Sequence, residues 1–229
     1  MPIKAVQSFS SWSYSRLTEW EKCPFKAMCK HFAKIKEPEP EPGSPLFHGK
    51  EAHQAAEDYL NHKIRGVPKL LCLFTNEFEQ LRKKHPQPEY ELALTTKWEP
   101  TGWFDAAAWL RIKIDVLWTQ GSTIHIVDYK TGKIREEQED QLELYAVGAF
   151  SMLPAPAVAG VSLWYLDQGE TRPLEGEKLY DGLTESAGLR RKWEKRVAPM
   201  LADTAFVPKP GNHCRWCHLQ QSKGGPCRF

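Results

Sequence analysis

The sequence predicts an α/β protein organised around a hairpin of two β-strands. Over residues 110–117 apolar side chains alternate with mostly polar ones, which is the period-two pattern of a strand. The tripeptide 120–122 breaks the pattern and suits a turn, and a second strand is expected over 123–129. Helices are expected over 47–61 and from about 136 to 150, before and after the hairpin. Strands that alternate with helices along the chain indicate the α/β class.

The hairpin carries two acidic residues and one basic residue that a single turn can bring together. Asp115 lies on the first strand, and Asp128 shares one face of the second strand with Lys130. Neighbouring carboxylates repel each other unless a cation lies between them, and Mg²⁺ or Mn²⁺ prefers carboxylate oxygen. A lysine beside such an ion can contact a water or an anionic substrate. The alternative interpretation is a surface hairpin with solvated charges.

Composition limits the class of protein. The chain has 229 residues, of which 41% are hydrophobic, so it can form one large domain or two small ones with a substantial core. We find no apolar run of membrane-spanning length and no signal peptide, so we expect a cytoplasmic protein without a membrane partner. The net charge of +2 does not indicate a nucleic-acid partner, and any basic surface must be local.

Capping residues, prolines and apolar spacing place the other elements. In chain order they are a short helix that begins near Ser15 and ends at Pro24, an extended proline-rich connection over 37–45, a helix over 70–84, a strand over 89–98, a buried strand over 157–166 and a helix over 182–197.

Two further pairs of residues could reach a metal ion. His53 and Glu57 are four residues apart on one helical face, although taken alone they favour a surface ion pair. Glu89 and Glu91 share a face of a strand and could meet the hairpin carboxylates, or they could be solvated edge charges.

Two groups of residues could contact nucleic acid. Gln141 and Tyr145 lie four apart on one helical face, where they could bond a phosphate or a base edge or simply pack the helix. Basic residues cluster over 190–196, which is compatible with phosphate binding but also with a solvated helix face.

Clustered cysteines in a cytoplasmic protein indicate a metal rather than disulfides. The chain has six cysteines, and the two-residue gap between Cys214 and Cys217 lets one turn present two thiolates to one metal. Cys227 offers a third ligand, and a fourth must come from elsewhere. Cys23 is the best candidate, with Cys29, His213 and His218 behind it, and either zinc or an iron–sulfur cluster would fit.

Taken together, these motifs carry a family resemblance. In chain order they are Ser15-Arg16-Leu17 with Cys23-Pro24, Gly49-x-x-x-His53, Ile114-Asp115, Val127-Asp128-Tyr129-Lys130-Thr131-Gly132, Gln141-x-x-x-Tyr145 and the C-terminal cysteines. The ordered set resembles the RecB-type branch of the PD-(D/E)XK nuclease superfamily. It is most similar to the iron–sulfur members, namely the AddB nuclease domain and the stand-alone exonucleases of CRISPR adaptation and of phages. The match runs from about Ser13 to Cys227.

The resemblance implies a fold and a set of roles. The fold would be a mixed central β-sheet flanked by helices, with a restriction-endonuclease-like core, a helical N-terminal segment and a cysteine-rich C-terminal tail. One domain would span 1–229, with the nuclease core at about 86–180 and an iron–sulfur clamp formed by Cys23 and 208–229. The implied roles are metal ligands at His53, Asp115, Asp128 and the Tyr129 carbonyl, a catalytic lysine at Lys130 beside Asp115 and Asp128, DNA contact and support of the site by Gln141 and Tyr145, and a 4Fe–4S cluster at Cys23, Cys214, Cys217 and Cys227.

Two residue patterns depart from the family. Asp128 replaces the glutamate of many members, which the motif allows. The nine residues between Cys217 and Cys227 exceed the usual gap, so zinc stays open as the alternative metal.

The expected function is a divalent-metal-dependent DNA exonuclease, using Mn²⁺ or Mg²⁺, that acts on single-stranded DNA or DNA ends in recombination, repair or phage replication. Two alternatives remain, a CRISPR-adaptation nuclease that works with integrase partners and a non-catalytic nucleic-acid-binding module. The complete set of Asp115, Asp128 and Lys130 argues against the non-catalytic module.

Overall fold

The computed structural model describes residues 8–134, 140–152, 157–174 and 176–229. The chain forms two compact units. The larger unit comprises Pro40–Trp193, and the smaller one combines the two ends of the chain, Met1–Glu39 and Glu194–Phe229.

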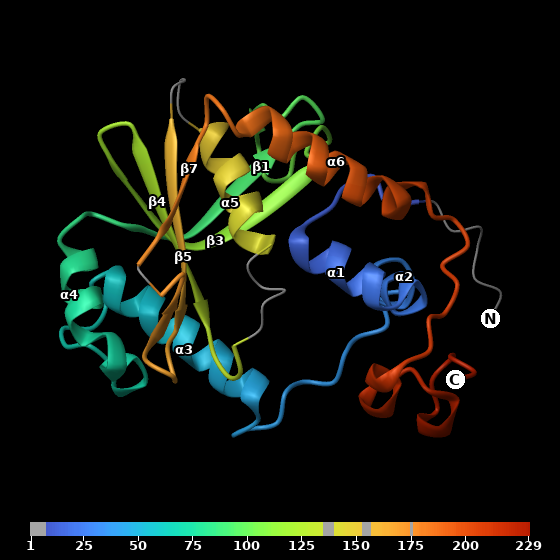
Figure 1. Cartoon of the computed structure of the whole chain (residues 1–229). Helices are drawn as coiled ribbons and strands as arrows, with labels where there is room; N and C mark the ends of the chain where they lie inside the picture. The colour runs from blue at the N-terminus through green and yellow to red at the C-terminus, as the bar shows by residue number, and fades with distance from the viewer. Residues whose placement is uncertain (1–7, 135–139, 153–156, 175) are drawn as a thin grey trace. The chain divides into compact units, whose positions relative to one another are not determined.

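The larger unit contains a seven-stranded mixed sheet, and most of its strands are labelled in Figure 1. Its strands are β1 (Gln87–Leu94), β2 (Pro100–Thr101), β3 (Leu110–Gln120), β4 (Thr123–Lys130), β5 (Val158–Tyr165), β6 (Glu170–Arg172) and β7 (Lys178–Asp181). The order is β2-β1-β3-β4-β5-β6, and β7 also pairs with β5. Only β4 and β5 run parallel; the other pairings among the described strands are antiparallel.

The expected hairpin is confirmed as β3 and β4. Its ladder runs from the Val116–Val127 pair to the Gln120–Thr123 pair, and Gly121 in the turn has a positive φ of 62° that favours glycine. On its other edge, β3 pairs with β1 from Leu117 back to Leu110. The end of β4 therefore lies next to the middle of β3, which is where the two aspartates fall.

Helices cover both faces of the sheet, as the family resemblance implies. Neighbouring residues of β4 point to opposite faces. Val127 and Tyr129 pack in an apolar cluster with α3 (Pro45–Leu60) and α4 (Thr75–Arg82). Asp128, between them, bonds instead to Tyr145 of α5 (Asp140–Phe150). Each large apolar side chain buried in such a cluster contributes about 1.5–3 kcal/mol.

The chain sets these helices against the sheet by local rules. The Ser44 side chain caps α3 by accepting a hydrogen bond from the Phe47 amide. In α5, a Cβ at Gly148 would lie 2.9 Å from Ile112 Cδ1, so glycine allows the helix to approach the sheet closely. Residues 136–139, the expected first turn of this helix, fall outside the described residues.

Three expected elements differ in detail. The helix expected over 70–84 is a 3₁₀-helix, η1 (Lys69–Phe74), followed by α4. Strand β1 ends at Leu94 because the Thr95 hydroxyl accepts hydrogen bonds from two amides of the following turn. The helix expected over 182–197 is α6 (Ser186–Ala202), which crosses from one unit to the other.

The smaller unit begins with α1 (Tyr14–Lys22) and α2 (Pro24–His31). Ser13, rather than Ser15, caps α1. Pro24 starts α2 as well as ending α1, since its fixed φ suits a first helical position. The rings of Phe9, Phe32 and Phe206 pack together and join the two ends of the chain within this unit.

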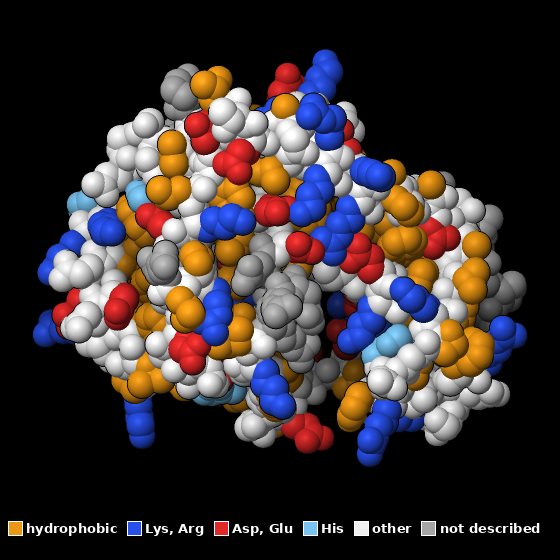
Figure 2. Space-filling model, in the orientation of Figure 1, with side chains coloured by type: hydrophobic (Ala, Val, Ile, Leu, Met, Phe, Trp, Pro, Cys, Tyr) orange, Lys and Arg blue, Asp and Glu red, His pale blue; other side chains and the backbone are white. Residues whose placement is uncertain are grey.

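The surface carries charges of both signs. On the face drawn in Figure 2, lysine and arginine side chains are interspersed with aspartate and glutamate side chains. Among the helices of the described ranges, none has the length and apolar character needed to cross a membrane.

Candidate active site

Asp128 and Lys130 form a tight ion pair at the end of β4. The Lys130 Nζ lies 2.5 Å from Asp128 Oδ2, and the Asp128 residue is only 3% exposed. Burial opposes the charge of Lys130, but the neighbouring carboxylates, Asp128 first, raise its pKa overall. Lys130 is therefore held as a cation, which suits stabilisation of negative charge rather than proton abstraction.

Gln141 and Tyr145 of α5 support this pair. The Tyr145 hydroxyl donates to Asp128 Oδ1, and Gln141 Nε2 donates to the same oxygen at 3.3 Å. Lys130 Nζ in turn donates to Gln141 Oε1 at 3.0 Å. Burial and the nearby Asp128 raise the pKa of Tyr145 well above its usual range, so its hydroxyl stays a donor. Tyr145 is 2% exposed, and its expected contact with DNA stays a prediction.

Asp115 lies across from this pair and joins β3 to α3. Its Oδ2 accepts a hydrogen bond from the Tyr129 amide at 2.7 Å, and its Oδ1 lies 3.3 Å from His53 Nδ1. Burial and then Asp128 raise the pKa of Asp115. Burial disfavours the imidazolium of His53, but Asp115 outweighs it and the pKa of His53 is raised. The carboxylate of Asp115 therefore favours a positive charge on His53.

Glu89 of β1 completes a group that fits a divalent ion. Ligand atoms of His53, Glu89 and Asp115 lie within 4.8 Å of one another. Two carboxylates and an imidazole are ligands that Mn²⁺ and Mg²⁺ accept. Of the residues expected to hold the ion, His53 and Asp115 thus meet directly, and Asp128 lies near enough to raise the pKa of Asp115. The role of the Tyr129 carbonyl stays a prediction.

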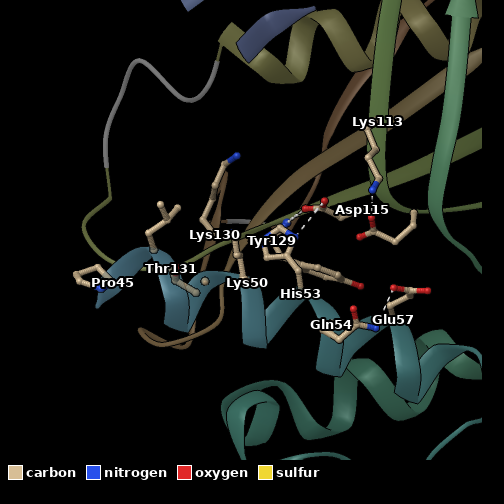
Figure 3. A pocket seen from close by; sticks show the side chains of 13 residues that line it. Pro45, Lys50, His53, Gln54, Glu57, Lys113, Asp115, Tyr129, Lys130 and Thr131 are labelled. Carbon is tan, nitrogen blue, oxygen red and sulfur yellow. Dashed lines mark hydrogen bonds and ion pairs between the residues drawn. The ribbon is translucent and has the colours of Figure 1, made fainter. Parts of the chain in front are cut away.

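A pocket of about 800 Å³ is lined by His53, Glu89, Asp115, Tyr129 and Lys130, among others. Figure 3 shows that α3 supplies one wall, with His53 directed towards Asp115 and Gln54 towards Glu57 of the same helix. A Cβ at Gly49 would lie 3.0 Å from Thr131 Oγ1, so this glycine lets α3 approach the loop that follows Lys130. The same loop is fixed by Asp167, which accepts a hydrogen bond from the Gly132 amide at 2.7 Å.

A family model for the PD-(D/E)XK nuclease superfamily matches residues 11–222. The chain belongs to this superfamily. Its members use divalent metals, in agreement with the ligand group of the pocket. The finer expectation, the iron–sulfur branch with AddB-like features, stays a prediction.

Two solved structures resemble the chain at low sequence identity. A protein designated SSO0001 is 12% identical, with a TM-score of 0.43, and the match covers 93% of this chain and 86% of that one. A protein from Eubacterium rectale, provisionally described as an exonuclease, is 12% identical with a TM-score of 0.47, covering 96% of this nuclease and 89% of that chain. None of the curated protein sequences matches the chain.

The smaller unit of this nuclease brings the expected cysteines together. One pocket is lined by Cys23, Cys214, Cys217 and Cys227, and also by His213. Cys23 lies at the junction of α1 and α2, and a 3₁₀-helix, η3 (Asn212–Trp216), carries Cys214. A Cβ at Gly225 would lie 2.3 Å from the Leu219 backbone, so the tail needs glycine to fold back and present Cys227.

Cys29 is a fifth thiol that lies near Cys23, Cys217 and Cys227. It is 1% exposed, and burial, together with the thiols of Cys227, Cys23 and Cys217, raises its pKa to about 11. Cys72, the sixth cysteine, is exposed in η1 of the larger unit.

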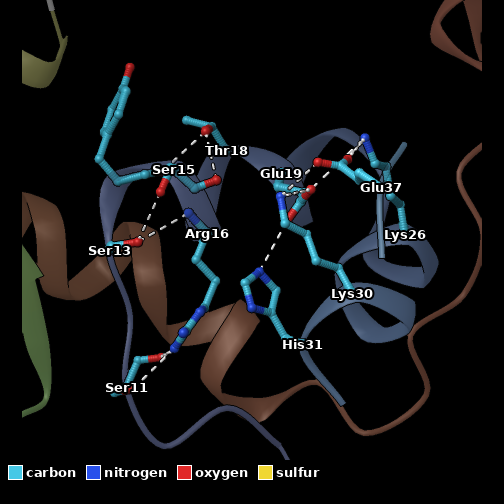
Figure 4. Close-up of polar contacts among 11 residues, drawn as sticks. Ser11, Ser13, Ser15, Arg16, Thr18, Glu19, Lys26, Lys30, His31 and Glu37 are labelled. Atoms are coloured by element: carbon cyan, nitrogen blue, oxygen red, sulfur yellow. Dashed lines mark hydrogen bonds and ion pairs between the residues drawn. The ribbon is translucent and has the colours of Figure 1, made fainter. Parts of the chain in front are cut away.

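A charged network ties together α1 and α2, the two helices that meet at Cys23. Glu19 of α1 meets Lys30 at 3.1 Å and His31 at 3.0 Å, as Figure 4 shows. Glu37 bonds Lys26 at 2.6 Å and Lys30 at 3.2 Å. Bonding to Lys26, stronger than the opposing effect of burial, lowers the pKa of Glu37 to about 2.

The sequence left some site residues unassigned. Glu89 and Glu91 were equivalent by strand alternation, and only the structure selects Glu89. Lys113 lines the pocket and pairs with Glu89 at 2.6 Å. Its position two residues before Asp115 on an alternating strand was the signal that places it on the same face.

We expect Tyr145→Phe to lower the hydrolysis rate about 10–100-fold, because loss of a supporting hydrogen bond misplaces a metal ligand or catalytic group. The ring stays buried, so thermal unfolding should change little. Nuclease rates and circular-dichroism melts measure both. Tyr59→Phe, in the buried α3–α4 cluster, is the control. Equal rates for wild type and Tyr145→Phe would contradict the supporting role.

We expect Glu37→Gln to lower the melting temperature at pH 7 by a few degrees, equivalent to less than about 1 kcal/mol for a partly exposed pair. Because the folded pKa of Glu37 lies below the ordinary value of 4.5, its stabilisation is present above about pH 4.5 and is lost as pH falls through about 2. The difference between the two proteins should therefore shrink over that range in melting experiments. Glu41→Gln, at an exposed position, should show no such pH-dependent difference.

Proposed function

We propose that this nuclease is a divalent-metal-dependent exonuclease that hydrolyses DNA from single-stranded or free ends. The observation that carries the proposal is that Lys130, the ion-pair partner of the buried Asp128, lines the same open pocket as the His53–Glu89–Asp115 ligand group. An acidic metal site beside a buried lysine is a suitable arrangement for phosphodiester hydrolysis.

Each side chain has a distinct task in this proposal. His53, Asp115 and Asp128 would hold the ion, and Glu89 lies where it can join them. When bound, the ion supplies Lewis-acid chemistry, lowering the pKa of a water and neutralising phosphate charge. An imidazole ligand suits Mn²⁺ better than the harder Mg²⁺.

Lys130 orients the attacking water or stabilises the charge that develops on the phosphate. Its protonated state and its bond to Gln141 hold the ammonium group in one place before substrate arrives. Gln141 and Tyr145 act chiefly by positioning Asp128 and Lys130. Gln141 is only partly buried and is the member of the pair that can also reach a DNA strand.

The smaller unit is proposed to hold a 4Fe–4S cluster on Cys23, Cys214, Cys217 and Cys227. The four thiols line one pocket, and a cubane cluster takes four thiolates, which supports this proposal. Zinc held by Cys and His ligands is the alternative.

The catalytic proposal is tested with end-labelled single- and double-stranded DNA in Mn²⁺. We expect cleavage that EDTA abolishes, and loss of activity in Asp115→Ala, Asp128→Ala and Lys130→Ala. Lys130→Ala should keep most of its Mn²⁺ binding, since the lysine is not a ligand, whereas Asp115→Ala should not. Lys97→Ala, outside the pocket, is the control.

Covalently closed circular DNA separates the exonuclease from an endonuclease, because only free ends serve an exonuclease. Cleavage of circles as fast as of linear molecules would disprove the exonuclease mode. Full activity in Lys130→Ala would disprove the assigned catalytic role.

The cluster proposal predicts that anaerobically purified protein is brown and carries about four irons per chain. Cys23→Ala should lower iron content and melting temperature, because the metal links the two ends of the chain and its binding contributes to folding. Cys72→Ala should change neither. Colourless protein with one zinc per chain, retained in Cys23→Ala, would refute the cluster and its proposed fourth ligand.

A further inference from the structure

Glu89 occupies a strained position directly opposite Asp115. The antiparallel register pairs Pro88 with Val116 and Tyr90 with Ile114, so Glu89 and Asp115 are cross-strand neighbours. Glu89 has a φ of 53°, in the left-handed region that a residue with a side chain adopts at a cost in free energy. Like charges opposite each other on neighbouring strands repel. The left-handed backbone and the like-charged neighbour are both unfavourable, and both accompany the position of this carboxylate in the pocket.

The Glu89 carboxylate is shared between two candidate cations. Its Oε2 lies 2.6 Å from Lys113 Nζ, while its ligand oxygen is within 4.8 Å of the ligand atoms of His53 and Asp115. An ion bound by that group would compete with the lysine for the same carboxylate. The Glu89 side chain is 24% exposed and the Lys113 side chain 55% exposed, so the lysine has room to move away.

Lys113 is placed to meet a substrate strand once it leaves Glu89. It lines the pocket from β3, two residues before Asp115, and its ammonium group points towards the metal-binding side chains in Figure 3. While its charge is neutralised by Glu89, it is a poor ligand for phosphate. A lysine freed from its partner binds a backbone phosphate as a point charge.

We propose that the bound divalent ion takes Glu89 from Lys113, and that the released Lys113 binds a backbone phosphate of the DNA. The exchange rests on the proposed function and explains how a protein of small net charge gains affinity for DNA where its ion is bound. Lys113 is a positioning residue in this scheme, and Glu89 is the carboxylate that passes from one cation to the other.

The exchange makes metal and DNA binding cooperative, and linkage requires the coupling to be reciprocal. It also gives the two side chains opposite effects on the two ligands. Without Lys113, the ion has no competitor for Glu89, so the metal binds more tightly while DNA binds more weakly. Without the Glu89 charge, Lys113 has lost its ion-pair partner before the ion arrives and keeps only the weaker attraction of Glu91 and Asp115, so metal binding weakens while metal-free DNA binding strengthens. A merely structural ion pair would not separate the two affinities in this way.

The test uses the full chain with Lys130→Ala as the common background, so that DNA is not consumed. Mn²⁺ affinity is measured by calorimetry without DNA. The affinity for a labelled single-stranded oligonucleotide is measured by fluorescence anisotropy with and without Mn²⁺. Lys113→Gln should tighten Mn²⁺ binding several-fold and weaken DNA binding in Mn²⁺ several-fold. Glu89→Gln should weaken Mn²⁺ binding and strengthen DNA binding without Mn²⁺.

Salt dependence gives an independent measure of the phosphate contact. One lost contact to a single strand lowers the slope of log K against log salt by about 0.7. We expect this loss in Lys113→Gln with Mn²⁺ present and no change in slope without Mn²⁺. Lys97→Gln removes one exposed lysine charge outside the pocket and should change neither the slope nor the Mn²⁺ affinity.

The outcomes separate the two proposals. If the wild-type protein cleaves DNA but Lys113→Gln leaves Mn²⁺ affinity unchanged or weakens it, the exchange is wrong and the proposed function stands. If the wild-type protein neither binds nor cleaves DNA, the proposed function fails, and the phosphate-binding role of Lys113 fails with it.

Discussion

The larger unit depends on the control of repulsion between two buried carboxylates, Asp115 and Asp128. In both side chains the two carboxylate oxygens have different partners. One oxygen of Asp115 is fixed by the Tyr129 amide and one of Asp128 by the Tyr145 hydroxyl, so both carboxylates are anchored to the fold. The second oxygen of each faces a positive group, His53 or Lys130. The site is thus built to attract positive charge, because burial makes unpaired carboxylates costly.

The sheet and its two helical layers provide the rigidity that such a site requires. Asp128 belongs to a strand that is paired on both edges, by β3 and β5, and its side chain is fixed by a helix whose apolar face is buried. His53 comes from the opposite layer, on a helix brought close by Gly49. Catalytic and metal-binding groups supported in this way keep their geometry better than groups on loops.

The smaller unit shows a different use of the fold, because it is assembled from both ends of the chain. Its ring cluster joins Phe9 and Phe32 to Phe206, and its pocket joins Cys23 to Cys214 and Cys227. Closing so long a loop has an entropic cost that grows only slowly with length. Within this unit, apolar packing, the Glu21–Arg196 ion pair at 2.8 Å and the gathered thiols offset that cost.

The sequence by itself determined the elements with strong periodicity and the motif residues that they carry. The β3–β4 hairpin, the α3 helix and β5 follow from apolar spacing, and the positions of Asp128 and Lys130 on one face follow from strand alternation. Short edge strands such as β6 and β7 have too few residues to show a period. The choice of Ser13 over Ser15 as a cap depends on where the chain enters the helix.

Tertiary structure alone decided which polar residues meet. Glu89 and Glu91 are equivalent in sequence, and the left-handed backbone at Glu89 selects the one that enters the pocket. The spacing of Tyr145 allows it either to contact nucleic acid or to pack its helix, and in the structure α5 buries it against Asp128. Cys29 joins the other thiols only because α2 folds against the tail. In each case the local sequence pattern allows several partners. Contacts between segments far apart in the chain determine which partner is used, and no single segment contains that information.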